Sequence, residues 1–131
     1  RIRRDTLGRH VPIIVFTKGG GQWLEALAGS GADCIGVDWT VNLAMARDRT
    51  KGVVCLQGNM DPTVLLAGDQ AIEKEAHRVL DEFGTVDKNV GHVFNLGHGI
   101  LQSTPPEAVA TLVQVVQAYS RRYHRKKEVL C

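Results

Sequence analysis

The sequence predicts an α/β protein built on a parallel sheet. Short, nearly continuous apolar runs alternate with amphipathic stretches, and each run gives way to glycine or polar residues at its carboxyl end. Strands that helices cover on both faces have such continuous apolar runs. Regular alternation with helices indicates βαβ units, in which neighbouring strands are parallel. The sheet is then either an open doubly wound sheet or an arc of a (β/α)8 barrel.

Four strands and four helices are expected in strict alternation. The strands are predicted at Val11–Thr17, Asp33–Asp38, Gly52–Gln57 and His92–Leu96, because runs rich in apolar and β-branched residues favour strands. The helices are predicted at Trp23–Ala28, at Leu43–Arg49, at Ala71–Phe83 and from Thr104 to about Tyr123.

The two longer helices rest on apolar stripes at helical spacing. The first stripe is Ile72, Ala76, Val79, Leu80 and Phe83, and the second is Val109, Leu112, Val113, Val116 and Tyr119. Two proline segments mark where helical turns begin, Asp61-Pro62 and Thr104-Pro105-Pro106-Glu107. At Asp61-Pro62 the aspartate can cap the helix, and proline can take the first helical position.

Composition limits the possible classes of protein. A chain of 131 residues, 44% hydrophobic and 23% charged, is expected to form one domain with a core. No apolar stretch has the length of a membrane span, so no membrane partner is predicted. Basic residues gather at the two ends: Arg1, Arg3, Arg4 and Arg9, then Arg121, Arg122, Arg125, Lys126 and Lys127. Aromatics are few and no nucleic-acid module is visible, so these residues are interpreted as solvated ends.

The three cysteines, Cys34, Cys55 and Cys131, are odd in number and widely spaced. No C-x-x-C or H-x-C motif is present, so neither a zinc site nor a disulfide framework is predicted. Cys34 and Cys55 lie in apolar runs and are expected to be buried small hydrophobes. A reducing, cytoplasm-like compartment fits this usage.

Ligands are expected at the carboxyl ends of the strands, whether the sheet is open or part of a barrel. The segments there are Lys18-Gly19-Gly20-Gly21, Asp38-Trp39-Thr40, Gln57-Gly58-Asn59 with Asp61, and Asn95-Leu96-Gly97-His98-Gly99. The first segment either cradles a phosphate or is a plain turn, and Asp38 either acts as a base or orients its neighbours. In both cases the plainer alternative is favoured. No nucleophile, acid and base can be assigned together.

His98, between two glycines, is the most informative residue of this edge. Glycine on both sides lets the backbone turn sharply and lets a ligand approach closely. An imidazole can donate or accept a hydrogen bond near neutral pH. We therefore treat His98 as the leading candidate for a binding residue, against the simpler alternative of a turn histidine.

Four segments resemble one family in their residues, their order along the chain and their spacing. They are Phe16-Thr17-Lys18-Gly19-Gly20-Gly21, Gly36-Val37-Asp38-Trp39-Thr40, Leu56-Gln57-Gly58-Asn59-Met60-Asp61-Pro62 and Phe94-Asn95-Leu96-Gly97-His98-Gly99-Ile100. Together they resemble the uroporphyrinogen decarboxylase family, as does Thr104-Pro105-Pro106-Glu107 after the last of them. The resemblance runs from about Val11 to about Tyr119.

The resemblance implies a single (β/α)8 barrel, a fold of about 250 residues. Residues 1–131 would then be one partial barrel domain, the C-terminal part with about strands five to eight. The family's N-terminal arginine-rich loop and its aspartate have no counterpart in this chain. We therefore expect the piece alone to be inactive, and we expect its exposed edge strands to favour self-association.

The resemblance also implies a reaction and a role for His98. The family removes the four acetate carboxyl groups of uroporphyrinogen III as CO2, giving coproporphyrinogen III for haem or chlorophyll, without metal or organic cofactor. Of the family's substrate-contacting residues, only the histidine of the N-L-G-H-G motif has a counterpart in this chain. That counterpart is His98, which is expected to donate a hydrogen bond to a substrate carboxylate. Gly97 and Gly99 would let the substrate come close, and Trp39 and Phe16 would line the cleft. No catalytic residue and no metal ligand is expected in this chain.

The full-length protein would be a homodimer in the cytoplasm, or in a plastid if its source is a photosynthetic eukaryote. Two alternatives stay open. A corrinoid-linked methyltransferase of the same superfamily would bind zinc through an H-x-C motif, which this sequence lacks. A non-catalytic half-barrel would keep only a binding surface.

Overall fold

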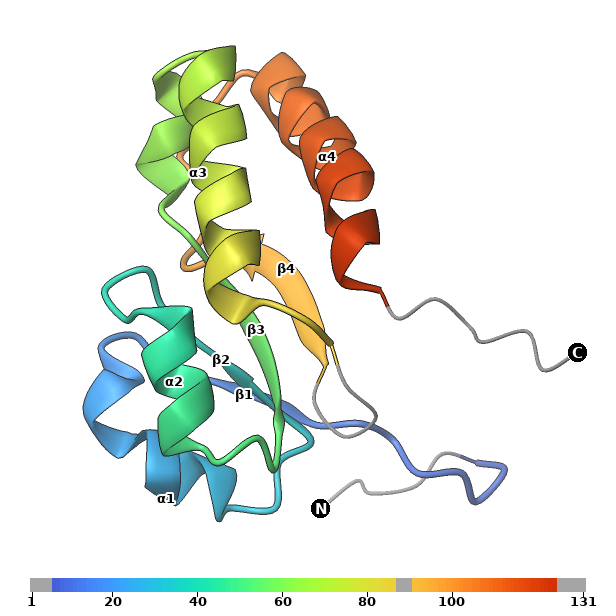
Figure 1. Cartoon of the computed structure of the whole chain (residues 1–131). Coiled ribbons are helices and arrows are strands. Elements are labelled where there is room, and N and C mark those ends of the chain that lie inside the picture. The colour runs from blue at the N-terminus through green and yellow to red at the C-terminus, as the bar shows by residue number, and fades with distance from the viewer. Residues whose placement is uncertain (1–5, 87–90, 125–131) are drawn as a thin grey trace, which may run out of the picture.

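The computed structural model describes residues 6–86 and 91–124, which form one parallel sheet with helices packed on it (Figure 1). The strands are β1 (Ile14–Phe16), β2 (Cys34–Gly36), β3 (Cys55–Met60) and β4 (His92–Leu96). The α-helices are α1 (Leu24–Ala28), α2 (Leu43–Arg49), α3 (Asp69–Phe83) and α4 (Pro106–Ser120). Three short 3-10 helices are η1 (Gly20–Trp23), η2 (Pro62–Leu66) and η3 (Arg121–Tyr123). The predicted alternation of strands and helices is confirmed.

The order of the strands separates the two architectures that the sequence left open. The sheet order is β1-β2-β3-β4, and all three pairings are parallel. A doubly wound sheet reverses its strand order at a switch point, and this sheet does not. The helices follow the same sequence, since α1 contacts α2, α2 contacts α3 and α3 contacts α4. The chain is therefore part of a (β/α)8 barrel, with each strand followed by its covering helix.

The core fills the space between the sheet and the helices. The apolar stripe predicted for α3 is buried as expected, with Ile72, Ala76 and Val79 at 0% exposure. These side chains meet Ile35 and Leu56 from the sheet in one apolar cluster. Full burial of one large aliphatic side chain stabilises the fold by about 1.5–3 kcal/mol. Packing on this face is what holds the helices to the strands.

The opposite face of the sheet is not covered within the described residues. Cα partners across parallel strands share a face, and the register joins Phe16 to Gly36, Gly36 to Gln57, and Gln57 to Val93. This open face leaves Phe16 49% and Val93 45% exposed. The expectation that all four strands are buried on both faces is thus wrong for β1 and β4, and of the four strands only β2 is buried at every residue. In a closed barrel this face is the interior.

The third strand lies later in the sequence than predicted. The prediction was Gly52–Gln57, but β3 spans Cys55–Met60. Lys51 and Gly52 have φ values of 52° and 59°, and the Gly52 amide donates to the carbonyl of Arg47 at 3.2 Å. These residues close the end of α2, a position that favours glycine. As a result, the segment from Gln57 to Asn59 lies inside the strand and not after it.

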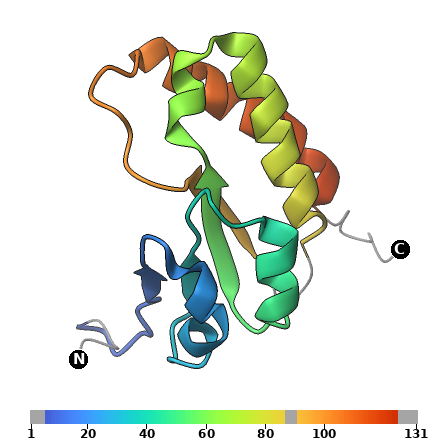
Figure 2. The same cartoon turned by 90° about the vertical axis from the view of Figure 1, so that its left-hand side faces the viewer.

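The remaining boundaries differ by a few residues. β1 is three residues long, α3 begins at Asp69, and α4 begins at Pro106 and ends at Ser120. Figure 2 shows the segment after β4 crossing over to the start of α4. No helix in the described part of the chain is long and apolar enough to cross a membrane. Much of the basic sequence at the two ends, including Arg1–Arg4 and Arg125–Lys127, lies outside the described residues, as does Cys131.

Candidate functional site

Asp38, at the end of β2, ties two loops together at the carboxyl edge of the sheet. Its carboxylate accepts hydrogen bonds from the amide of Gly19, after β1, and from the amide and hydroxyl of Thr40. Burial opposes ionisation of Asp38, but these bonds and the nearby Lys18 charge together lower its pKa. These hydrogen bonds occupy the carboxylate, which holds the two loops in place. Of the two predicted roles for Asp38, a base or a residue that orients its neighbours, the structure supports the second.

The ends of β3 and β4 are fixed to the same loop after β2. The buried Asn59 amide donates to the carbonyl of Asp38 at 2.9 Å and to the carbonyl of Val41. Gly97 lies so close to this loop that an added Cβ would stand 2.3 Å from the Trp39 nitrogen. The ends of all four strands are therefore joined, which suits a binding site that must keep its geometry.

The glycine-rich segment after β1 behaves as a turn. Gly19 has a φ of 68°, and its amide is bonded to Asp38. The Gly20 amide donates to the carbonyl of Thr17 at 3.2 Å. Two amides that would face a phosphate in a cradle are thus bonded within the protein. The plain turn is the alternative that the geometry favours.

A cleft of about 430 Å³ opens on the uncovered face of the sheet, at its carboxyl edge. Its lining residues are Phe16, Gly36, Val37, Gln57, Asn95, Leu96, His98, Gly99 and Ile100. The cleft combines apolar side chains with a few polar groups, as ligand sites generally do. It lies at the mouth of the partial barrel, where barrel proteins bind their ligands.

His98 stands beside two aromatic rings that come from other strand ends. Its ring centroid is 5.5 Å from that of Trp39, with the planes at 90°, and 6.4 Å from that of Phe16, with the planes at 67°. Edge-on contacts at such distances are favourable and restrict the imidazole. Within the described residues no hydrogen bond to the ring is present. His98 is exposed and able to bond a ligand.

The structure brings most of the predicted site residues together. Phe16, His98 and Gly99 line the cleft, and Trp39 is half-buried against the His98 ring. A Cβ atom added at Gly99 would have no neighbouring atom within 4 Å, so there is open space beside this residue. Gly97 is buried and approaches the protein's own backbone.

Two further lining residues, Gln57 and Asn95, belong to the strand-end segments where ligand contacts were predicted, but the sequence assigned neither a specific role. The predicted third strand ended at Gln57, which hid the fact that its side chain belongs to the open face. The alternation of Leu56, Gln57 and Gly58 within a strand would have placed it there.

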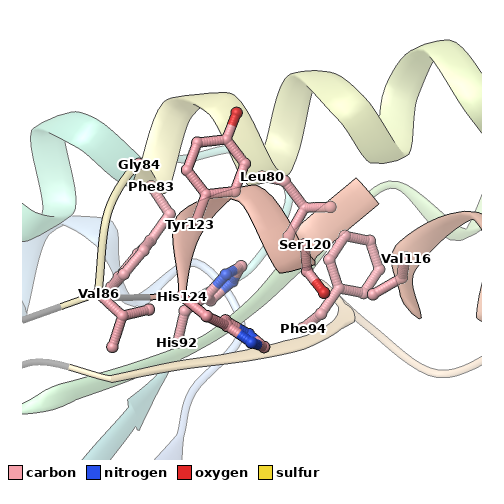
Figure 3. Close-up of a pocket in the computed structure, with 10 residues that line it drawn as sticks. All are labelled: Leu80, Phe83, Gly84, Val86, His92, Phe94, Val116, Ser120, Tyr123 and His124. Atoms are coloured by element: carbon pink, nitrogen blue, oxygen red, sulfur yellow. The ribbon is translucent and has the colours of Figure 1, made fainter. Parts of the chain in front are cut away.

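A second hollow lies on the helix side of the sheet and is a poorer candidate. It holds about 200 Å³ between α3, β4 and α4, and Figure 3 shows its mainly apolar and aromatic lining. Two of its polar side chains already have partners: His92 Nε2 donates to the carbonyl of Gly58 at 2.7 Å, and Tyr123 donates to Asp81. Phe83 stacks on the His92 ring with a centroid distance of 4.5 Å. This space serves packing between the helices and β4.

The cysteines of the sheet do not form a reactive site. Cys34 and Cys55 are partners in the register of β2 and β3. Burial, with the neighbouring Cys55, raises the pKa of the Cys34 thiol to about 12. Cys34 is 5% exposed, as expected of a small apolar residue in a strand, whereas Cys55 is only partly buried and differs from the expectation. In the parts of the chain that are described, no group of three or more His, Cys, Asp and Glu side chains is placed to hold a metal.

A parallel barrel arc with a cleft at its carboxyl edge defines the class: a (β/α)8 protein with a candidate ligand site, of which this chain forms part. A sequence model of uroporphyrinogen decarboxylase (URO-D) matches residues 2–119. The chain therefore belongs to the uroporphyrinogen decarboxylase family.

Curated relatives agree with this assignment, and a solved structure shares the fold. The chain is 63% identical to uroporphyrinogen decarboxylase of Bordetella petrii over 94% of its own length and 34% of the relative's. It is 60% identical to that of Cupriavidus pinatubonensis over 92% and 33% of the two chains. The chain thus spans about a third of the length of the relatives it matches. A methyltransferase from Methanosarcina mazei matches with a TM-score of 0.71 at 20% identity, covering 86% of this chain and 33% of that one, and shows the fold alone.

Proposed function

We propose that this chain forms part of a uroporphyrinogen decarboxylase and supplies one wall of its substrate site. The observation that carries the proposal is the position of His98: a segment that resembles a family motif places an exposed imidazole at the mouth of the partial barrel. The reaction removes four acetate carboxyl groups from uroporphyrinogen III as CO2 and leaves coproporphyrinogen III.

The chemistry asks for a cleft and for hydrogen-bond donors. A pyrrole that takes up a proton on the carbon bearing the acetate arm becomes a cation, and this cation accepts the electron pair released when CO2 leaves. Groups that stabilise the developing charge must be fixed in place before the reaction. In this proposal the chain supplies a surface that the macrocycle contacts and a hydrogen-bond donor for its carboxylates. The groups that take part in the reaction lie elsewhere in the full-length protein.

In this proposal His98 binds a substrate carboxylate, and the rings of Phe16 and Trp39 keep it in place. An imidazole N–H is a suitable donor to a carboxylate. The open space at Gly99 lets the substrate approach. Gly97 acts indirectly, because its contact with the Trp39 backbone sets the position of the next residue, His98.

The family resemblance adds further proposals about the full-length protein. It would act without metal or organic cofactor, as a homodimer, in the cytoplasm. Its partner would be the tetrapyrrole substrate, without a nucleic acid.

The test uses a chimaera in which this chain replaces the matching third of the B. petrii relative. The chimaera is incubated anaerobically with uroporphyrinogen III, and the products are oxidised and separated by carboxylate number. We expect porphyrins with seven down to four carboxylates. His98→Ala should lower kcat/KM by about 10- to 100-fold, mainly through KM, because a hydrogen bond to a charged group contributes about 1.5–3 kcal/mol.

His124→Ala is the matched control. His124 is exposed on the far side of the sheet from the cleft, next to η3. It should retain the kcat/KM of the parent chimaera. A folded chimaera that leaves the substrate with eight carboxylates would contradict the proposed function and favour the methyltransferase or non-catalytic alternatives.

A further inference from the structure

Two amide side chains share the cleft with His98 and have no assigned role. Gln57 on β3 and Asn95 on β4 both line it. Among the described residues, neither the Gln57 amide nor the Asn95 NH2 group has a hydrogen-bond partner. Polar groups that line a cleft without partners are available to a ligand.

The strand register fixes both side chains on the open face. Gln57 is the Cα partner of Val93, and Asn95 follows Val93 by two residues on the same strand. Residues two apart on a strand point to the same side. Asn95 is therefore one strand across and one layer nearer the mouth than Gln57, at a distance of roughly 8 Å from the strand spacings. Both amides therefore lie on the face of the sheet that opens into the cleft lined by His98.

The orientation of the Asn95 amide is set by the backbone. Its Oδ1 accepts a hydrogen bond from the amide of Leu96 at 2.9 Å. The carbonyl half of the side chain is thus used, and the NH2 half is left to donate. Asn95 is exposed and Gln57 is half-buried, so a ligand in the cleft reaches both.

The surroundings of the amides favour a ligand that combines an apolar ring system with carboxylate arms. Phe16, Val37 and Ile100 supply apolar walls. Within the described chain no Asp or Glu lines the cleft, and the nearby Asp38 carboxylate is bonded to its own loops. An anionic arm would meet donors and no repelling carboxylate there.

We propose that Gln57 and Asn95 form a neutral amide pair that binds a carboxylate arm of the same ligand as His98. This inference rests on the proposed function, since it assigns the pair to the tetrapyrrole carboxylates. The side-chain amides are uncharged donors, so they hold a carboxylate less tightly than a cationic side chain would. A substrate that must lose four carboxyl groups in turn has to be released and repositioned, and weak neutral donors permit this. The pair acts on binding and not on the chemical step.

The test converts each amide to the carboxylic acid of the same shape in the chimaera. Asn95→Asp keeps the acceptor for the Leu96 amide, so the local fold is preserved while the outward donor becomes a negative charge. Gln57→Glu makes the same change one layer deeper. The control is Gln114→Glu, which adds a charge on the exposed side of α4, away from the cleft. Two quantities are measured: KM and kcat for uroporphyrinogen III, and the affinity for uroporphyrin I, a stable octacarboxylate, by fluorescence.

We expect Asn95→Asp and Gln57→Glu each to raise KM and the Kd for uroporphyrin I by about 10-fold or more. We also expect kcat to stay within about twofold and the Gln114→Glu control to leave all three values unchanged. Unchanged KM and Kd in an active chimaera would overturn the amide pair and leave the proposed function standing. A folded chimaera that is inactive, yet binds uroporphyrin I less tightly after either substitution, would overturn the proposed function and retain the carboxylate site. Failure of the parent chimaera to bind uroporphyrin I would overturn the pair as well.

Discussion

Replacing Gly97 by alanine is expected to force apart the loops that follow β2 and β4. The added Cβ would lie 2.3 Å from the Trp39 nitrogen and 2.9 Å from both the Asp38 carbonyl carbon and the Trp39 Cα. Ordinary contacts begin at 3.4 Å, so the two backbones must separate by about 1 Å. The neighbours are main-chain atoms and cannot rotate aside. The shift also strains the hydrogen bond from the Gly97 amide to the carbonyl of Met60, now 2.8 Å.

Overpacking of this kind costs about 1–3 kcal/mol, and weakening the hydrogen bond adds about 1 kcal/mol. We therefore expect Gly97→Ala to lower the free energy of unfolding by about 2–4 kcal/mol, a large share of what an ordinary domain possesses. The measurement is urea unfolding of the chain followed by tryptophan fluorescence, because Trp39 lies at the contact.

Gly99→Ala is a control on the other side of His98. Nothing lies within 4 Å of its added Cβ, so its effect should stay within about 0.5 kcal/mol. Equal losses for the two variants would refute the reasoning, since they would show that the tight contact at Gly97 does not decide the cost.

Two pH-dependent predictions follow from groups whose pKa is lowered by folding. Asp38 takes up a proton less readily in the folded protein, so the free energy of unfolding should fall as the pH drops below about 4. In an acid titration, Asp38→Asn should lose less of its free energy of unfolding over this pH range, and it should be less stable at neutral pH. Burial lowers the pKa of His92, although its bond to the Gly58 carbonyl opposes this. Stability should therefore decrease as the pH falls through the ordinary histidine range near 6.5, and urea unfolding of His92→Gln at several pH values should show less dependence. An equally steep dependence in either variant would assign the proton uptake to other groups.

The sequence predicted well those features that depend on local pattern. Alternating runs and caps located all four strand–helix units, and the stripe from Ile72 to Phe83 placed the buried face of α3. Asp38 was expected to orient its neighbours, and its bonds to Gly19 and Thr40 confirm this. Such features follow from residues close together in the chain.

Other features depend on partners that the pattern does not specify. The apolar residues of β1 look the same in sequence whether a helix or the far side of a barrel covers them. Phe16 was expected to line the cleft, but the 51% exposure of Ile14 was not foreseen. The start of β3 was misplaced because Val53 and Val54 continue the apolar run, although they lie between the left-handed turn at Lys51 and Gly52 and the first strand residue, Cys55. The meeting of Phe16, Trp39 and His98 required the three-dimensional arrangement of distant strand ends.

The consecutive order of the strands has a consequence for synthesis on the ribosome. Each described strand pairs only with the strand before or after it in the chain, so a newly made strand finds its partner already present and need not wait for a distant segment. Domains emerge from the ribosome from the amino end at about 5–20 residues per second, which leaves time for each short βα unit to dock on the previous one. The growing edge of the sheet is then always the last strand made, and it is there that a chaperone would find unpaired backbone to protect.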